Sequence, residues 1–256
     1  MKDVQSQFDE RNISLNEVGV KNLAYPVELR NDRGDWISTR AVFTCAVGLP
    51  AEQKGTHMSR FVELISENNR LELSKLRNLL QDMQKKLDAC SSFLKIQFSY
   101  FVRKTSPVTG RESLMEVEVE IRAALIEDDF TMEVTVRTPV TTLCPCSKEI
   151  SDYSAHNQRA IVSITANTKK FIPFETFVKL SEESASSPLY TLLKRPDEKY
   201  VTEWAYDHPR FVEDVAREVK QRVDDLSGIR SYVIEVESFE SIHNHSAYAK
   251  IISTED

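Results

Sequence analysis

The stretch LMEVEVEIRAALI, residues 114–126, alternates apolar and charged side chains along most of its length. The apolar side chains on one face are Val117, Val119, Ile121, Ala123 and Leu125, and the charged ones on the other are Glu116, Glu118, Glu120 and Arg122. Successive side chains of a β-strand point to opposite faces of the sheet, so the alternation predicts a strand with one buried and one solvated face. This pattern is typical of an antiparallel sheet that is covered on one side.

Hydrophobic periodicity on either side of this strand predicts the remaining elements. Before it, we expect two strands within residues 18–50, a helix from about Met58, an amphipathic helix over residues 73–90 and a strand over residues 94–102. After it, we expect strands over residues 130–140 and 160–166, helices over residues 174–183 and 209–228, and strands over residues 231–236 and 246–252. Pro209 is expected in the first turn of its helix, where proline is tolerated.

Each half of the chain therefore has the order ββααββ, which predicts two tandem modules, residues 1–127 and residues 128–256. Antiparallel strands with helices inserted in mid-module predict an α+β fold with the helices on one face of each sheet. A chain of 256 residues, of which 41% are hydrophobic, is long enough to bury a core in both.

Composition and charge exclude several classes of protein. No apolar run approaches the roughly 18 residues of a membrane span, and the N-terminal sequence MKDVQSQFDERN lacks the apolar stretch of a secretory signal. A cytoplasmic protein without a membrane partner is expected. The net charge of −7 and the absence of a long Lys and Arg run argue against nucleic acid as a partner, because neutralising phosphates requires clustered cations.

The cysteines are too few and too unevenly spaced for a disulfide framework, so reduced thiols are expected. Cys45 and Cys90 fit apolar faces and are predicted to be core residues. Cys144 and Cys146 flank Pro145, which favours an extended conformation for the residue before it. The two thiols are therefore expected to diverge rather than share one metal ion, so that one could bind metal while the other meets a substrate. An inert buried pair is an equally good interpretation of two such cysteines.

Histidines supply the next candidates. His156 lies twelve residues after Cys144 in a polar loop and could bind the same ion through its imidazole. His243 and His245 follow Glu240 just before the last predicted strand, and side chains two residues apart in an extended segment point the same way. A solvated turn with neutral histidines is the alternative interpretation of this segment.

Two acidic residues carry weaker signals. Glu213 lies in the first turn of a predicted helix, where favourable interaction with the helix dipole alone would explain it. Glu198 lies in the charged segment KRPDEK and would be a surface residue in most proteins.

Three segments, LPAEQKGTHMSRF (residues 49–61), TTLCPCSKEISDYSAHNQR (residues 141–159) and ESFESIHNHSAYA (residues 237–249), resemble the type IB GTP cyclohydrolases. The resemblance implies the tunnelling fold, with two modules in each chain and a homo-oligomer that is expected to be a tetramer. It also implies conversion of GTP to 7,8-dihydroneopterin triphosphate and formate, the entry step to folate and to deazaguanine-modified tRNA.

The same resemblance assigns roles to residues. The implied ligands of a divalent metal, zinc, iron(II) or manganese, are Cys144, His156 and Glu198. The residues implied to face the reacting imidazole ring of GTP are Cys146, Glu240, His243 and His245. Glu213 is implied to anchor guanine, whose N1–H and 2-amino group are adjacent donors that one carboxylate can accept. Cations for the triphosphate, proposed from position alone, are Lys148, Arg159 and Arg60.

Two other functions compete with this interpretation. A zinc nucleobase deaminase would carry His-x-Glu followed by Pro-Cys-x-x-Cys, and the Cys-Pro-Cys segment here lacks both. A non-catalytic purine- or pterin-binding protein with a structural metal remains open, because one fold can host several activities. Release of formate from GTP would distinguish the enzyme from the binding protein.

Overall fold

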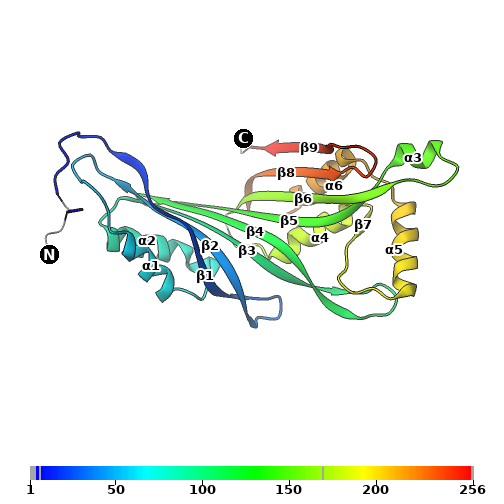
Figure 1. Ribbon diagram of the computed structural model, residues 1–256, viewed down its shortest axis with the longest axis horizontal. Helices are drawn as coiled ribbons and strands as arrows, with labels where there is room; N and C mark the ends of the chain where they lie inside the picture. The colour runs from blue at the N-terminus through cyan, green and yellow to red at the C-terminus, as the bar shows by residue number, and fades with distance from the viewer. Residues whose placement is uncertain (1–3, 6, 169, 255–256) are drawn as a thin grey trace. The chain divides into compact units, whose positions relative to one another are not determined.

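The computed structural model describes residues 4–5, 7–168 and 170–254 and contains one nine-stranded sheet (Figure 1). Its strands are β1 (Leu15–Arg30), β2 (Trp36–Leu49), β3 (Ser91–Thr105), β4 (Glu112–Ile126), β5 (Asp129–Leu143), β6 (Asn157–Thr168), β7 (Ser187–Pro188), β8 (Ile229–Phe239) and β9 (Ser246–Ser253). They follow the order β1-β2-β3-β4-β5-β6-β8-β9, and β7 pairs with β5. The helices are α1 (Met58–Glu67), α2 (Leu76–Leu87), α3 (Pro145–Ile150), α4 (Phe174–Ser184), α5 (Arg195–Asp207) and α6 (Val212–Asp224), with a 3₁₀ turn η1 (Leu73–Lys75). The predicted α+β fold is confirmed.

The chain forms two compact units. The first unit comprises Met1–Ser99 and Glu120–Glu133, and the second comprises Tyr100–Val119 and Val134–Asp256. The long strands β3, β4 and β5 contribute to both units. These units are defined by contacts and do not show whether the two halves of the chain repeat one fold. The division into two modules, residues 1–127 and 128–256, therefore stays a prediction.

In the first unit, α1 and α2 pack against the antiparallel pair β1 and β2. Helix α2 buries the apolar stripe that its sequence predicted. It ends at Leu87, because Asp88 adopts a left-handed conformation with φ 54° and breaks the helical path. The helix is therefore shorter than the predicted residues 73–90, and its first turn is replaced by η1. Cys90 lies beyond the helix end and is exposed, so the prediction that it belongs to the core is wrong. Cys45 is buried, as predicted.

In the second unit, α4 and α6 pack together, and α6 also packs against β8 and β9. Every second residue of β6 and β8 is buried along most of each strand, as a sheet covered on one face requires. Helix α6 buries Val215, Val219 and Val223 on one stripe. It begins at Val212, so Pro209 lies in the connection before the helix. The prediction that Pro209 occupies the first turn is therefore wrong.

Helix α5 was not expected from the sequence. It buries only Asp197 and Ala205, so it lacks the apolar stripe that reveals most helices. The second half of the chain consequently differs from a plain ββααββ order, since α5 and the short strand β7 are inserted between α4 and α6.

Asp197 fixes the start of α5 to the turn between β3 and β4. Its Oδ1 accepts hydrogen bonds from the backbone N–H groups of Val108 (2.9 Å) and Thr109 (2.8 Å). Its Oδ2 accepts from the Thr109 hydroxyl (2.6 Å) and from the Lys194 N–H (2.9 Å). Burial disfavours ionisation of Asp197, but these hydrogen bonds outweigh it and hold the pKa of the carboxyl well below its ordinary value. The turn therefore positions the helix that carries Glu198.

Replacing Asp197 by Ala should lower the melting temperature, because the backbone donors of Val108, Thr109 and Lys194 lose their buried acceptor. Because the pKa of Asp197 is lower in the folded state than in the unfolded state, the ionised carboxylate stabilises the fold at neutral pH. This stabilisation is lost progressively as the pH falls below about 4, the pKa of an aspartate in the unfolded chain. Calorimetry at pH 7 and at pH 3 should therefore show a large difference between wild type and variant at pH 7 and a smaller one at pH 3. Asp207→Ala, at the exposed end of the same helix, is the control and should change little. Equal differences at both values of pH would contradict the ionised role of Asp197.

Candidate functional site

The Cys-Pro-Cys segment lies at the end of β5 and begins helix α3. Cys144 is the N-cap residue, with φ −68° and ψ 117°, and Pro145 occupies the first turn. The extended conformation predicted for Cys144 is thus confirmed. Its Sγ accepts a hydrogen bond from the Ser147 N–H at 3.5 Å. Cys144 is half-buried and Cys146 is exposed, and both are free thiols.

His156 lies where the loop after α3 returns to the sheet. The backbone N–H of Cys144 donates to the His156 carbonyl at 3.2 Å, which closes the loop between β5 and β6. The predicted partners Cys144 and His156 are therefore joined through their backbones.

Gln158 connects three elements of the site. Its Oε1 lies 2.7 Å from His156 Nδ1, and its Nε2 lies 3.3 Å from both Glu240 Oε1 and Thr142 Oγ1. Strand register explains the proximity, since Ala160 pairs with Ser238 in the antiparallel pair β6 and β8. Two further residues along each strand bring Gln158 opposite Glu240. We refer to Thr142, His156, Gln158 and Glu240 as the Gln158 network.

The network determines which nitrogen of His156 carries the proton. A carboxylate only accepts hydrogen bonds, so the Gln158 amide group directs its NH₂ to Glu240 and its oxygen to His156. The oxygen also only accepts, which places the proton of neutral His156 on Nδ1. The lone pair of Nε2 is then available for a metal ion or a substrate.

His243 and His245 lie beside this network. Their ring centroids are 5.1 Å apart with an interplanar angle of 36°, and His243 Nδ1 lies 4.0 Å from Glu240 Oε2. The residues between Glu240 and β9 form bends and not an extended strand, so the predicted conformation of this segment is wrong. The two rings are adjacent all the same, and both histidines are exposed.

The predicted metal ligands are only partly brought together. Glu198 is exposed in the first turn of α5. Among residues 4–5, 7–168 and 170–254, no group of three His, Cys, Asp or Glu side chains is placed to hold a metal ion. The donor types still fit a divalent ion, because His156 presents an available Nε2 and Cys144 a free thiol at the adjoining chain segment.

Of the three cations proposed for the triphosphate, two donate hydrogen bonds to backbone carbonyls and the third is exposed. Lys148 Nζ donates to the Tyr206 carbonyl at 2.5 Å and lies 4.1 Å from the centre of the Tyr206 ring. Arg60, in the first unit, donates to the Lys86 carbonyl at 2.9 Å. Arg159 is exposed on β6, next to Gln158 in the chain.

Glu213 does not cap α6. The neighbouring residue Asp214 caps the helix instead, since its Oδ2 accepts a hydrogen bond from the Phe211 N–H at 3.0 Å. Glu213 is exposed in the first turn of the helix.

Sequence reasoning missed Gln158 and Thr142. A signal for Gln158 was present, because residues two apart in an extended strand share a face and Gln158 follows His156 at that spacing. Amides are common on strand surfaces, so their chemistry alone does not mark a site.

The chain as described has no helix with the length and apolar character needed to cross a membrane.

Two urate oxidases resemble the chain in structure. One from Arthrobacter globiformis has a TM-score of 0.53 at 8% identity and covers 94% of each chain. One from Bacillus sp. TB-90 has a TM-score of 0.51 at 7% identity and covers 94% of this chain and 100% of its own. At such low identity these likenesses show a shared fold and nothing about chemistry.

Sequence comparison is more specific. A family model described as type I GTP cyclohydrolase FolE2 matches residues 1–249. The GTP cyclohydrolase FolE2 of Thermosipho africanus is 48% identical over 254 residues, 99% of this chain and 98% of the relative. That of Thermotoga maritima is 49% identical over 249 residues, 97% of this chain and 96% of the relative. The chain belongs to the type I GTP cyclohydrolase FolE2 family.

Proposed function

We propose that the protein is a GTP cyclohydrolase of type IB that hydrolyses GTP to 7,8-dihydroneopterin triphosphate and formate, the first step of folate biosynthesis. The observation that carries the proposal is the Gln158 network with His243 beside it, in a chain whose family membership extends over nearly its whole length. Histidine and carboxylate side chains are the groups that enzymes most often use as general acids and bases.

The reaction opens the imidazole ring of guanine at C8. A divalent metal ion, zinc, iron(II) or manganese, held by Cys144, His156 and Glu198 would supply an activated water for attack on C8. His243 or His245 would give a proton to the neighbouring ring nitrogen, with Glu240 orienting His243 across the 4.0 Å between them. Cys146 would assist hydrolysis of the resulting formamide, by hydrogen bonding or covalently.

We assign substrate binding to charged side chains of the chain. Glu213 would accept the N1–H and 2-amino hydrogens of guanine, a role consistent with its exposure and with the capping role of Asp214. Lys148, Arg159 and Arg60 would offset the charge of the triphosphate. Of these, Arg159 is the one next to Gln158 in the chain, so we expect it to contribute most.

The finer fold and the assembly are also proposals. We infer a tunnelling fold of two modules, and a homotetramer that acts in the cytoplasm without nucleic acid or membrane partners. The sheet ends in β1 and β9, and β9 has no buried residue. Tyr248 and Ile252 are 71% and 65% exposed on this edge strand. Proteins rarely leave such an edge open, which favours pairing with another subunit.

Formate release tests the proposed function. Protein stripped with a chelator should release no formate from GTP, and adding back zinc, iron(II) or manganese should restore release together with a fluorescent pterin after oxidation. ATP is the control nucleotide and should yield no formate. Protein that binds GTP but releases no formate with any of the three metals would be the non-catalytic binding protein instead.

Gln158→Leu should weaken metal binding about tenfold to a hundredfold, because His156 would lose the acceptor that holds its proton on Nδ1. The measurement is zinc affinity by competition with a chromophoric chelator, with the melting temperature recorded alongside. Gln97→Leu is a matched control, since Gln97 Nε2 donates to Glu120 Oε2 at 3.0 Å in the first unit. A variant at Gln158 with normal zinc affinity and a lowered melting temperature would show that the residue only supports the strand.

A further inference from the structure

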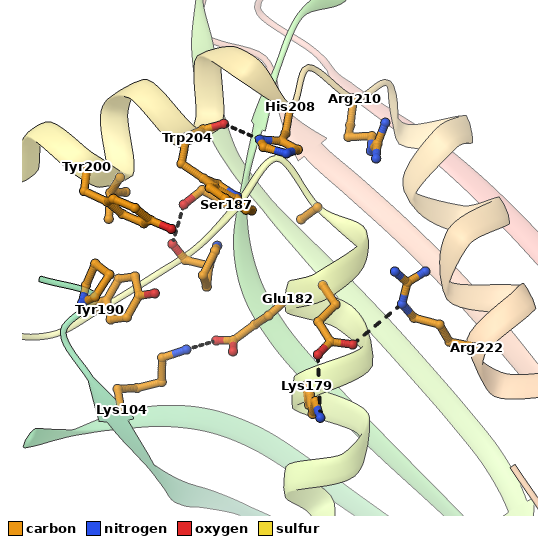
Figure 2. A pocket seen from close by; sticks show the side chains of 15 residues that line it. Lys104, Lys179, Glu182, Ser187, Tyr190, Tyr200, Trp204, His208, Arg210 and Arg222 are labelled. Carbon is orange, nitrogen blue, oxygen red and sulfur yellow. Dashed lines mark hydrogen bonds and ion pairs between the residues drawn. The ribbon is translucent and has the colours of Figure 1, made fainter. Parts of the chain in front are cut away.

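The second unit contains a cavity of about 480 Å³ that the proposed reaction does not use (Figure 2). Its walls come from α4, α5, the segment around β7, and the two arginines Arg210 and Arg222. None of the residues that line it belongs to the Gln158 network. The volume is within the range of pockets for small molecules.

One wall of the cavity is a row of aromatic rings on α5. Tyr200 and Trp204 stack with centroids 5.8 Å apart and an interplanar angle of 19°, and Trp204 and His208 stack at 4.1 Å and 20°. The spacing of four residues places all three rings on one side of the helix (Figure 2). Trp204 and Tyr200 remain 43% and 42% exposed. A row of partly exposed aromatic rings suits a planar ligand, because aromatic ring systems pack favourably against one another.

Charged side chains line other parts of the cavity. Lys104 pairs with Glu182 at 2.5 Å, and Lys179 lies 3.7 Å from Glu183. Arg222 lies 3.8 Å from Glu183 and pairs with Glu218 at 2.6 Å. Burial raises the pKa of Glu182, and Lys104 opposes this shift without cancelling it. Glu182 therefore loses its negative charge at a higher pH than an exposed glutamate does.

Among the cations that line the cavity, Arg210 forms no ion pair with any residue that the structure describes. Its Nε is buried and has no hydrogen-bond partner among the described residues. Arg210 lines the cavity, so an anion bound there would supply the counter-charge that its guanidinium lacks. In total, four cations and two carboxylates line the cavity.

We propose that this cavity is a second binding site, for a planar heteroaromatic ligand that carries a phosphate group and has the size of a nucleoside monophosphate. The ring packs against the exposed edge of the aromatic row that Tyr200 and Trp204 form, and the phosphate meets Arg210. None of the residues assigned to GTP is among those that line this cavity.

Isothermal titration calorimetry of the full-length protein with AMP tests the proposal. AMP should bind saturably below about 1 mM, a range expected for one stacked ring and one charge-assisted contact. Adenosine, which lacks the phosphate, and ribose 5-phosphate, which lacks the ring, should each bind at least tenfold more weakly. No saturable binding of AMP, or equal binding of either fragment, would overturn the proposal.

Substitutions at Trp204 and Arg210 test whether AMP binds in this cavity. Trp204→Leu and Arg210→Gln should each weaken AMP binding at least tenfold, and Trp204→Phe should retain most of it, which guards against loss through misfolding. Trp36→Leu removes the other tryptophan, which lies in the first unit, and should have no effect. Unchanged affinity in Trp204→Leu would overturn the site.

Glu213→Gln separates this proposal from the proposed function. AMP binding should survive that substitution, and its loss would place the nucleotide in the guanine site and overturn a second site. If the protein released no formate from GTP but bound AMP with the expected variant pattern, the cyclohydrolase proposal would fail while the cavity site stood.

Discussion

Cys146→Ala should retain bound metal and lose GTP turnover by about a hundredfold or more, whereas Cys144→Ala should lose metal affinity as well as turnover. The two thiols have different surroundings. Cys144 is half-buried at the N-cap of α3, and its backbone N–H bonds the His156 carbonyl, so its thiol belongs to the segment that carries the imidazole ligand. Cys146 is exposed on the first turn of α3 and is available to a substrate.

Elemental analysis of the purified variants, together with formate release, checks this prediction. Cys90→Ala is the matched control, because Cys90 is another exposed free thiol but lies in the first unit. It should keep both metal and turnover. A metal-free Cys146→Ala with a fully loaded Cys144→Ala would reverse the two roles.

Much of the fold could be predicted from hydrophobic periodicity alone. The alternation in residues 114–126 becomes β4, and the predicted helix over residues 174–183 becomes α4. The prediction missed a helix that tertiary hydrogen bonds hold in place, since periodicity detects only helices that bury an apolar face. Helix α5 is held by the hydrogen bonds of Asp197, and Ala205 is its one buried apolar residue, so it lacks the buried apolar stripe from which α2 and α6 were predicted.

The site was predictable in its residue types and less so in its geometry. The sequence pointed to His156 and Glu240 as separate candidates, and the register of β6 against β8 joins them through Gln158. That register depends on pairing between strands far apart in the chain, which a single sequence does not contain. The rings of His243 and His245 are adjacent because of bends, and not through the extended conformation that suggested their proximity.

Glu213→Gln should weaken the binding of a non-reacting GTP analogue at least tenfold and up to a few hundredfold. The amide replaces one acceptor by a donor that faces the donors of guanine, and losing a charged hydrogen-bond partner costs about 2 to 4 kcal/mol once bound guanine shields Glu213 from water. If Glu213 only complements the dipole of α6, the same change should cost about 0.3 to 1 kcal/mol of stability and leave GTP binding intact. The dissociation constant and the melting temperature, measured on the same protein, distinguish the two roles.

Asp214→Asn is a control from the next position of the same helix turn. Asp214 accepts the Phe211 N–H at 3.0 Å and lies 3.7 Å from Arg217, so its replacement should lower the melting temperature and leave affinity for the analogue unchanged. The two variants should therefore have opposite effects, with Glu213→Gln losing affinity and Asp214→Asn losing stability. Near-normal affinity and a lowered melting temperature in Glu213→Gln would assign Glu213 to the helix alone, and the guanine anchor would then have to be sought among the other carboxylates of the second unit.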